Sequence, residues 1–188
     1  MLSDNISFLC CLLQCYFMQG KLSENAARLK TEHIWGISRI LLGWMFLWAF
    51  LDKTFGLGYA TSADRAWING GSPTSGYLQF AVSGVFEPIF TSIAGNQFID
   101  VLFMLGLLLL GVALILGIGM RLATIGGILM FILLWSTNVP PANNPVIDEH
   151  IIYIFLLIGI YRVRAGQALG LGKWWSTTPL VKRIPFLE

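Results

Sequence analysis

Residues 98–118, with the sequence FIDVLFMLGLLLLGVALILGI, decide the fold of this 188-residue chain. The stretch holds one charged residue, Asp100, close to its start, and the rest is apolar. A helix needs about 20 apolar residues to cross the hydrocarbon core of a bilayer, and this stretch has that length. The sequence therefore predicts a transmembrane helix here.

The composition of the whole chain agrees with a membrane protein. Hydrophobic residues make up 56% of it and charged residues only 12%, whereas soluble domains carry about 25% charged residues. The net charge of +2 is too small to indicate nucleic-acid binding. The three cysteines, Cys10, Cys11 and Cys15, leave no disulfide framework or CxxC pair for the rest of the chain.

Three further apolar stretches extend the prediction to an all-α bundle of four transmembrane helices. They cover residues 33–51, 122–137 and 147–161. Because the link at 119–121 is short, we expect the two helices that it joins to be antiparallel neighbours.

This interpretation divides the chain into three parts. The parts are a cytoplasmic N-terminal segment (1–31), the transmembrane domain (32–165) and a cytoplasmic tail (166–188). Residues 6–18 are apolar but too short to span a membrane, and Met18 is an alternative translation start.

The cations predict the orientation of the bundle. Four crossings place nine of them on one face and only Lys53 and Arg65 on the other, and an excess of Lys and Arg marks the cytoplasmic side. The nine are Lys21, Arg28, Lys30, Arg121, Arg162, Arg164, Lys173, Lys182 and Arg183. We therefore expect a multi-pass protein of the cell (inner or plasma) membrane with both termini in the cytoplasm.

Residues 76–95 are less apolar and show a different pattern. Polar residues recur at every fourth position, with apolar residues on the opposite face; the polar ones are Gln79, Ser83, Glu87 and Thr91. This pattern is typical of an amphipathic helix. We expect it to be an interfacial or re-entrant helix on the extracytoplasmic side, since a fifth crossing breaks the cation bias.

Two groups of polar residues near the extracytoplasmic ends are candidate site residues. His150, beside Asp148 and Glu149, is suited to proton transfer near neutral pH, although the two acids also fit a helix start. Lys53, Arg65 and Asn69 are candidates for binding an anionic substrate, although Lys53 also fits an interfacial anchor.

Arg39 is the charged residue well inside residues 33–51. A charge inside the membrane is costly, about 2.5–3.5 kcal/mol on insertion scales, and is a candidate functional group. Two alternatives stand beside each other: Arg39 extends to lipid phosphates at the cytoplasmic surface, or it pairs within the bundle or with an anionic ligand.

Several cofactors and functions are disfavoured. His33 and His150 are predicted on opposite faces and cannot together ligate a haem, and no metal site is expected. The chain has no Gly-rich nucleotide motif and no internal repeat of the kind found in many transporters.

The order and spacing of four motifs resemble the DoxX/DoxD family of small membrane proteins over roughly residues 32–175. The motifs are RILLGWMF at 39–46, Asp52-Lys53, WINGGSPT at 67–74 and NPVIDEH at 144–150. The resemblance implies four membrane helices. It further implies a relation to the membrane subunit of thiosulfate:quinone oxidoreductase, which oxidises thiosulfate to tetrathionate and passes the electrons to quinone.

The expected function is therefore a membrane subunit of a quinone-linked oxidoreductase of sulfur compounds such as thiosulfate. Quinone is then the electron acceptor, and a partner redox subunit or a second copy of the chain joins it in the bilayer. The alternative is a non-catalytic membrane anchor or scaffold of a redox or stress-defence complex.

Overall fold

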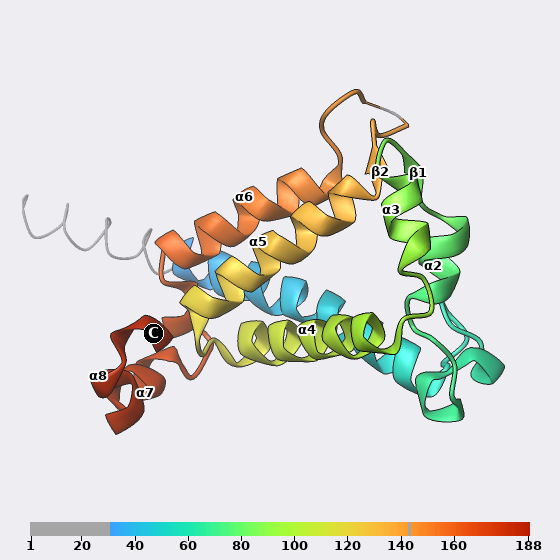
Figure 1. Cartoon of the computed structure of the whole chain (residues 1–188). Coiled ribbons are helices and arrows are strands. Elements are labelled where there is room, and N and C mark those ends of the chain that lie inside the picture. The colour runs from blue at the N-terminus through green and yellow to red at the C-terminus, as the bar shows by residue number, and fades with distance from the viewer. Residues whose placement is uncertain (1–30, 143) are drawn as a thin grey trace, which may run out of the picture.

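The computed structural model of the chain describes residues 31–142 and 144–188, and these residues are mostly helical. The body consists of helix Thr31–Phe55 and helices α4 (Gln97–Leu116), α5 (Met120–Ser136) and α6 (Glu149–Arg162). Figure 1 shows that these helices alternate in direction. One end of the molecule, called here the α7 end, carries α7 (Gly172–Thr177), and the other, the α2 end, carries α2 (Ser75–Phe80).

Two glycines let helix Thr31–Phe55 and α4 approach closely. A Cβ atom added to Gly111 would lie 2.8 Å from the backbone nitrogen of Leu47, and one added to Gly43 would lie 2.8 Å from Cβ of Leu114. Such small residues allow helix backbones to pack tightly in membranes. The second pair, α5 and α6, lies side by side and diverges from the first pair toward the α2 end (Figure 1).

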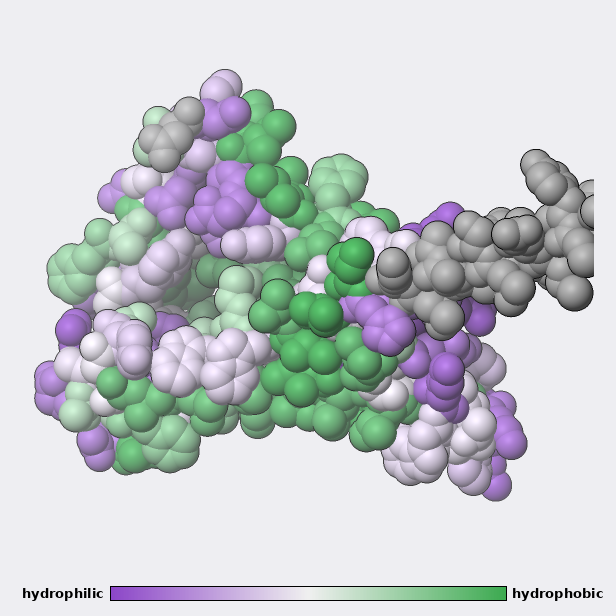
Figure 2. All heavy atoms as spheres, turned by 180° about the vertical axis from the view of Figure 1, so that it is seen from behind, coloured by the Kyte–Doolittle hydropathy of each residue, from purple (hydrophilic) through white to green (hydrophobic). Residues whose placement is uncertain are grey.

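The core between the helices is apolar, and so is much of the outer surface. Buried Phe46, Met104, Phe131 and Leu157 form part of the core. The helices also expose large apolar side chains, including Leu41 (64% exposed), Leu109 (64%), Leu129 (57%) and Phe155 (69%). Figure 2 shows hydrophobic residues spread over one face of the molecule. A helix that is apolar on its buried and its outer face is typical of a lipid-facing bundle.

Two of the four helices have the length and apolar composition to cross a membrane, helix Thr31–Phe55 and α4. These correspond to the predicted stretches 33–51 and 98–118. The predicted stretches 122–137 and 147–161 form α5, with 17 residues, and α6, with 14. As expected from their short link, α4 and α5 are packed neighbours.

The prediction of a single amphipathic helix over residues 76–95 is wrong. The chain there forms α2, a two-residue strand β1 (Ser83–Gly84) and α3 (Glu87–Ser92). Strand β1 pairs in parallel with β2 (Asn138–Val139), which follows α5. Gly84 has φ of 91°, and a Cβ atom there would lie 2.0 Å from the carbonyl oxygen of Val139. This backbone pairing interrupts the helix, so the polar residues do not form one stripe.

The C-terminal segment folds back against the α7 end of the bundle. It comprises η3 (Ala165–Gln167), α7, α8 (Pro179–Arg183) and η4 (Pro185–Leu187). The backbone N–H of Arg121 donates to the carbonyl of Glu188 at 3.0 Å. The cysteines, the proposed alternative start and nearly all of segment 1–31 lie outside the described residues.

The loop between helix Thr31–Phe55 and α2 contains two short 3₁₀ helices, η1 (Ala63–Arg65) and η2 (Trp67–Asn69). Figure 1 shows this loop at the α2 end, apart from the start of α6. The α2 end therefore presents two separate polar regions, one after helix Thr31–Phe55 and one before α6.

Candidate functional site

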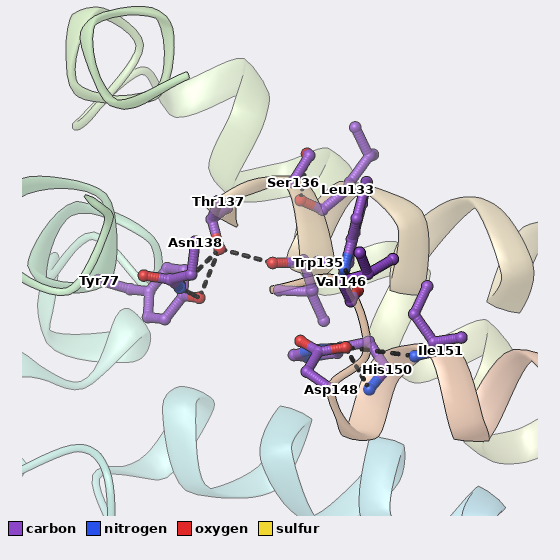
Figure 3. A network of polar contacts seen from close by, with 11 residues as sticks. Tyr77, Leu133, Trp135, Ser136, Thr137, Asn138, Val146, Asp148, His150 and Ile151 are labelled. Atoms are coloured by element: carbon purple, nitrogen blue, oxygen red, sulfur yellow. Dashed lines mark hydrogen bonds and ion pairs between the residues drawn. The ribbon is translucent and has the colours of Figure 1, made fainter. Parts of the chain in front are cut away.

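Asp148 and His150 form a hydrogen-bonded pair at the start of α6 (Figure 3). Asp148 is the N-cap of α6, and its Oδ1 accepts from the backbone N–H groups of His150 at 3.0 Å and Ile151 at 3.3 Å. Its Oδ2 lies 2.7 Å from Nδ1 of His150. A side chain that caps a helix is held in place by two backbone donors, so the imidazole beside it is oriented as well.

The capping bonds define the chemistry of the pair. An ionised carboxylate only accepts hydrogen bonds. Nδ1–H of His150 therefore donates a hydrogen bond to Oδ2 of Asp148. In the neutral imidazole this leaves Nε2 as an acceptor for a ligand or a proton.

An aromatic cluster lies on one side of the imidazole. The ring of Phe131 lies 6.0 Å from that of His150, and the rings of Phe46 and Tyr153 lie 5.2 and 5.3 Å from Phe131. The side chains of His150 and Asp148 are 20% and 15% exposed. The pair is thus half-buried at the edge of an aromatic cluster that joins helix Thr31–Phe55, α5 and α6.

Glu149, the third residue predicted for this site, does not join the pair. It is exposed and makes no hydrogen bond or ion pair with the residues that the structure describes. Consecutive residues in the first turn of a helix point in different directions, and the capping role of Asp148 turns Glu149 away.

A second polar cluster, at the end of α5, was not predicted (Figure 3). The hydroxyl groups of Tyr77 and Thr137 lie 2.7 Å apart, and Nδ2 of Asn138 donates to both, at 3.2 and 3.1 Å. Ser83 donates to Oδ1 of Asn138 at 2.9 Å. The cluster fastens the α2–α3 region to the end of α5. The only sequence signal was the polar Thr137-Asn138 step after an apolar run.

Lys53, predicted as a substrate contact, binds the chain itself. Its ammonium donates to the carbonyl of Pro73 at 3.2 Å. On the other side of the same turn, buried Asp100 accepts from the hydroxyls of Ser72 at 2.9 Å and Thr74 at 2.6 Å, and from the backbone N–H of Thr74. Together Lys53 and Asp100 clamp residues 72–74 between helix Thr31–Phe55 and α4.

Arg65 and Asn69, the other predicted substrate contacts, make local bonds in the loop. Nε of Arg65 donates to the hydroxyl of Ser62 at 3.1 Å, and Nδ2 of Asn69 donates to the carbonyl of Ala63 at 2.7 Å. Both side chains are exposed. No hydrogen bond or ion pair among the described residues joins this loop to His150, so the structure does not bring the predicted anion contacts and the predicted proton carriers together.

Arg39 is fully buried and bonds within the bundle, as one of its predicted alternatives has it, and it does not extend to the cytoplasmic surface. Its five N–H groups donate to five backbone carbonyls, four of them at 2.9 to 3.2 Å. The acceptors are Leu114, Ile115, Ala165, Ala168 and Leu169. A guanidinium has five N–H donors, so none is left for a lipid phosphate or an anionic ligand. Arg39 instead caps the last carbonyls of α4 and joins them to the C-terminal segment.

Asp52 has a similar structural role at the α2 end. It is buried, and its carboxylate accepts from the backbone N–H groups of Tyr59 at 3.3 Å and Ala60 at 3.0 Å. These bonds close the loop after helix Thr31–Phe55. The turn also needs Gly56, which has φ of 65° and follows the last residue of the helix.

Within the described residues no group of three or more histidine, cysteine, aspartate or glutamate side chains is placed to hold a metal ion. Comparison of the chain with protein-family models, with curated proteins and with solved structures finds no match.

Proposed function

We propose that the chain is an integral membrane protein in which helix Thr31–Phe55, α4, α5 and α6 each cross the bilayer. Two of these helices have the required length, and all four expose large apolar side chains. At 1.5 Å per residue α5 spans about 26 Å and α6 about 21 Å, less than the hydrocarbon thickness of about 30 Å. Flanking residues and local thinning of the bilayer accommodate such a difference.

The alternating directions of the helices support the orientation that the cations predict. Four crossings place the start of helix Thr31–Phe55 and the C-terminal segment at the same surface, the cytoplasmic one. The Asp148–His150 pair then lies at the opposite surface, half-buried at the outer end of the bundle.

We further propose that the Asp148–His150 pair carries protons for a quinone-linked redox reaction, the class of reaction that the resemblance to the DoxX/DoxD family implies. The observation that carries this is the oriented imidazole at the edge of an aromatic cluster. Quinone sites need an apolar, aromatic surface with a few fixed polar groups. Figure 2 shows a hollow in the surface between the two helix pairs, and we propose that the quinone head group enters there from the bilayer.

The reaction proposed for the complex balances with thiosulfate as donor. Two thiosulfate ions form one S–S bond to give tetrathionate and release two electrons, and a quinone takes up these electrons and two protons to give a quinol. The role of this chain is to bind the quinone and to supply the protons. Nε2 of His150 exchanges protons with the quinone oxygen, and Asp148 stabilises the imidazolium that forms between transfers.

Three variants at the start of α6 test this role. His150→Gln removes the proton carrier; Asp148→Asn keeps a good N-cap but removes the carboxylate charge; and Glu149→Gln is the matched control. We measure binding of a soluble short-chain quinone to the purified chain and thiosulfate-dependent quinone reduction by membranes at matched protein levels. His150→Gln should weaken quinone binding about tenfold, the value of one hydrogen bond, and flatten the pH profile of turnover near neutrality.

Asp148→Asn should change the pH profile in the same direction with a smaller loss of quinone affinity, and Glu149→Gln should behave as the wild type. Equal quinone binding and equal turnover in all four proteins would remove the pair from the proposal.

A non-catalytic membrane anchor is the second candidate. The observation that favours it is that Arg39, Asp52, Lys53 and Asp100 all direct their polar atoms at the chain's own backbone or loop hydroxyls. If each of the three variants still retains a partner subunit in the membrane and binds quinone as the wild type does, the anchor becomes the first candidate.

A further inference from the structure

A hollow of about 280 Å³ lies at the α7 end, where the link between α4 and α5, the end of α6 and the C-terminal segment meet. Its lining includes the side chains of three arginines, Arg121, Arg162 and Arg164. Arg121 lies at the start of α5, Arg162 is the last residue of α6, and Arg164 follows two residues later. This set of residues around the hollow is called the basic hollow below.

The guanidinium groups of the basic hollow have hydrogen-bond donors to spare. Arg162 and Arg164 are exposed and make no side-chain hydrogen bond or ion pair with any residue in 31–142 or 144–188. Arg121 uses only Nε, which donates to the hydroxyl of Tyr161 at 3.1 Å, while its guanidinium lies 5.4 Å from the ring centre of Phe186. Both terminal nitrogens of Arg121 keep their donors.

The charge of the hollow favours an anion. Among its lining side chains, three arginines face one acid, Glu188, so three positive charges and one negative charge leave +2. The helix dipole explains a cation in the last turn of α6, where Arg162 lies. It does not explain why Arg121, from another helix, and Arg164 border the same hollow.

We propose that the basic hollow binds a phosphate group. Guanidinium groups match phosphate oxygens in geometry and bind them with paired charged hydrogen bonds. Two sources share this chemistry, the head group of an acidic phospholipid and free inorganic phosphate. Basic pockets between membrane helices on the cytoplasmic side are suited to acidic head groups.

The surroundings of the hollow favour the lipid source. Trp174 in α7 is 60% exposed, and Leu180 in α8 is 50% exposed. Exposed aromatic and aliphatic residues on short helices at one end of a bundle are typical of segments that lie in the membrane interface. The lipid source rests on the proposed bilayer crossing, whereas phosphate binding by the hollow does not.

The test compares two double variants of the full chain in a neutral detergent. Arg162→Gln with Arg164→Gln removes two charges from the hollow; Lys173→Gln with Arg183→Gln removes two charges from the same segment outside its lining. Native mass spectrometry counts bound phosphatidylglycerol, with phosphatidylcholine of the same acyl chains as the neutral comparison and inorganic phosphate as competitor. Thermal unfolding midpoints confirm that both variants are folded.

We expect phosphatidylglycerol to bind more tightly than phosphatidylcholine. The hollow variant should bind phosphatidylglycerol about thirtyfold more weakly, since each cation near an anionic lipid contributes about fivefold, and the control variant should stay within about twofold of the wild type. Glu188→Gln should strengthen binding about fivefold for the same reason. Inorganic phosphate that competes at millimolar concentration would identify free phosphate as a ligand; phosphate that does not compete would identify the lipid.

Equal weakening in the two double variants, or no preference for phosphatidylglycerol together with no competition by phosphate, would overturn the proposal. Such a failure would not affect the proposed bilayer crossing, because cysteine labelling tests that crossing separately.

Discussion

Arg39 and the arginines of the basic hollow lie at the same end of the molecule, but they differ in whether their N–H groups bond the chain. All five N–H groups of Arg39 bond carbonyls of the chain, and its side chain is fully buried. The side chains of Arg162 and Arg164 are exposed and bond no side chain or carbonyl in the described part of the chain. An arginine that binds a ligand is therefore not identified by its position within an apolar stretch of sequence. It is identified by the number of its N–H groups that have no acceptor in the chain.

The largest expected effect is on folding, at Arg39. Arg39→Leu removes all five donors and leaves buried carbonyls at the end of α4 without partners, which should cost about 3 kcal/mol or more. Thermal unfolding of the purified chain in detergent measures this. Arg39→Lys should recover only part of the loss, because an ammonium cannot reach five carbonyls in two segments.

Arg183→Gln is the control for this series, since Arg183 is exposed in α8. It should change the stability by less than about 0.5 kcal/mol. A wild-type unfolding midpoint in Arg39→Leu would contradict the capping role.

An intermediate effect is expected at Asp100, which extends the comparison to the α2 end. Asp100→Asn removes the charge from an oxygen that accepts three hydrogen bonds, from Ser72 and from the backbone and side chain of Thr74. We expect a loss of about 1.5 kcal/mol, as for hydrogen bonds to a charged group. Limited proteolysis should then cut the loop 61–73 faster. Unchanged cleavage would show that Asp100 does not hold this loop.

Lys53 gives a smaller effect of the same kind. Lys53→Met keeps the apolar part of the side chain and removes one hydrogen bond to Pro73, which should cost about 1 kcal/mol. If Lys53 instead binds an anionic substrate, the same variant raises the apparent KM for thiosulfate and leaves the unfolding midpoint unchanged. Measuring both quantities on one preparation separates the two roles.

The smallest effect on stability is expected in the basic hollow. Arg162→Gln with Arg164→Gln should shift the free energy of unfolding by less than about 0.5 kcal/mol, because neither side chain bonds the described part of the chain. A loss comparable to that of Arg39→Leu would mean that these arginines hold the fold together, and the contrast with Arg39 would disappear.

The sequence predicted the features that depend on hydropathy and local chemistry. Residues 33–51 and 98–118 lie largely in helices long and apolar enough to cross a membrane, as the length of their apolar runs predicted. Asp148 and His150 were predicted together because they lie two positions apart at an expected helix start. Glu149 was wrongly grouped with them, since the same local geometry directs it outward.

The sequence did not predict the features that depend on contacts between distant parts of the chain. The acceptors of Arg39 lie 75 to 130 residues away in the sequence, so no local pattern reveals them. The helix predicted over 76–95 is broken by pairing with Asn138–Val139, a contact that periodicity within 76–95 does not encode. The separation of Lys53, Arg65 and Asn69 from His150 likewise depends on how the loop folds at the α2 end.

Cysteine labelling tests the central claim, four crossings of the bilayer, most directly. In a protein with Cys10, Cys11 and Cys15 replaced by serine, single cysteines are placed at Ala63, Val146 and Thr177, all exposed in the structure. An impermeant thiol reagent added to intact cells should label Ala63→Cys and Val146→Cys but not Thr177→Cys, which should react only after lysis. If only helix Thr31–Phe55 and α4 cross the membrane, Val146→Cys stays unlabelled until lysis together with Thr177→Cys, and that result would contradict the account.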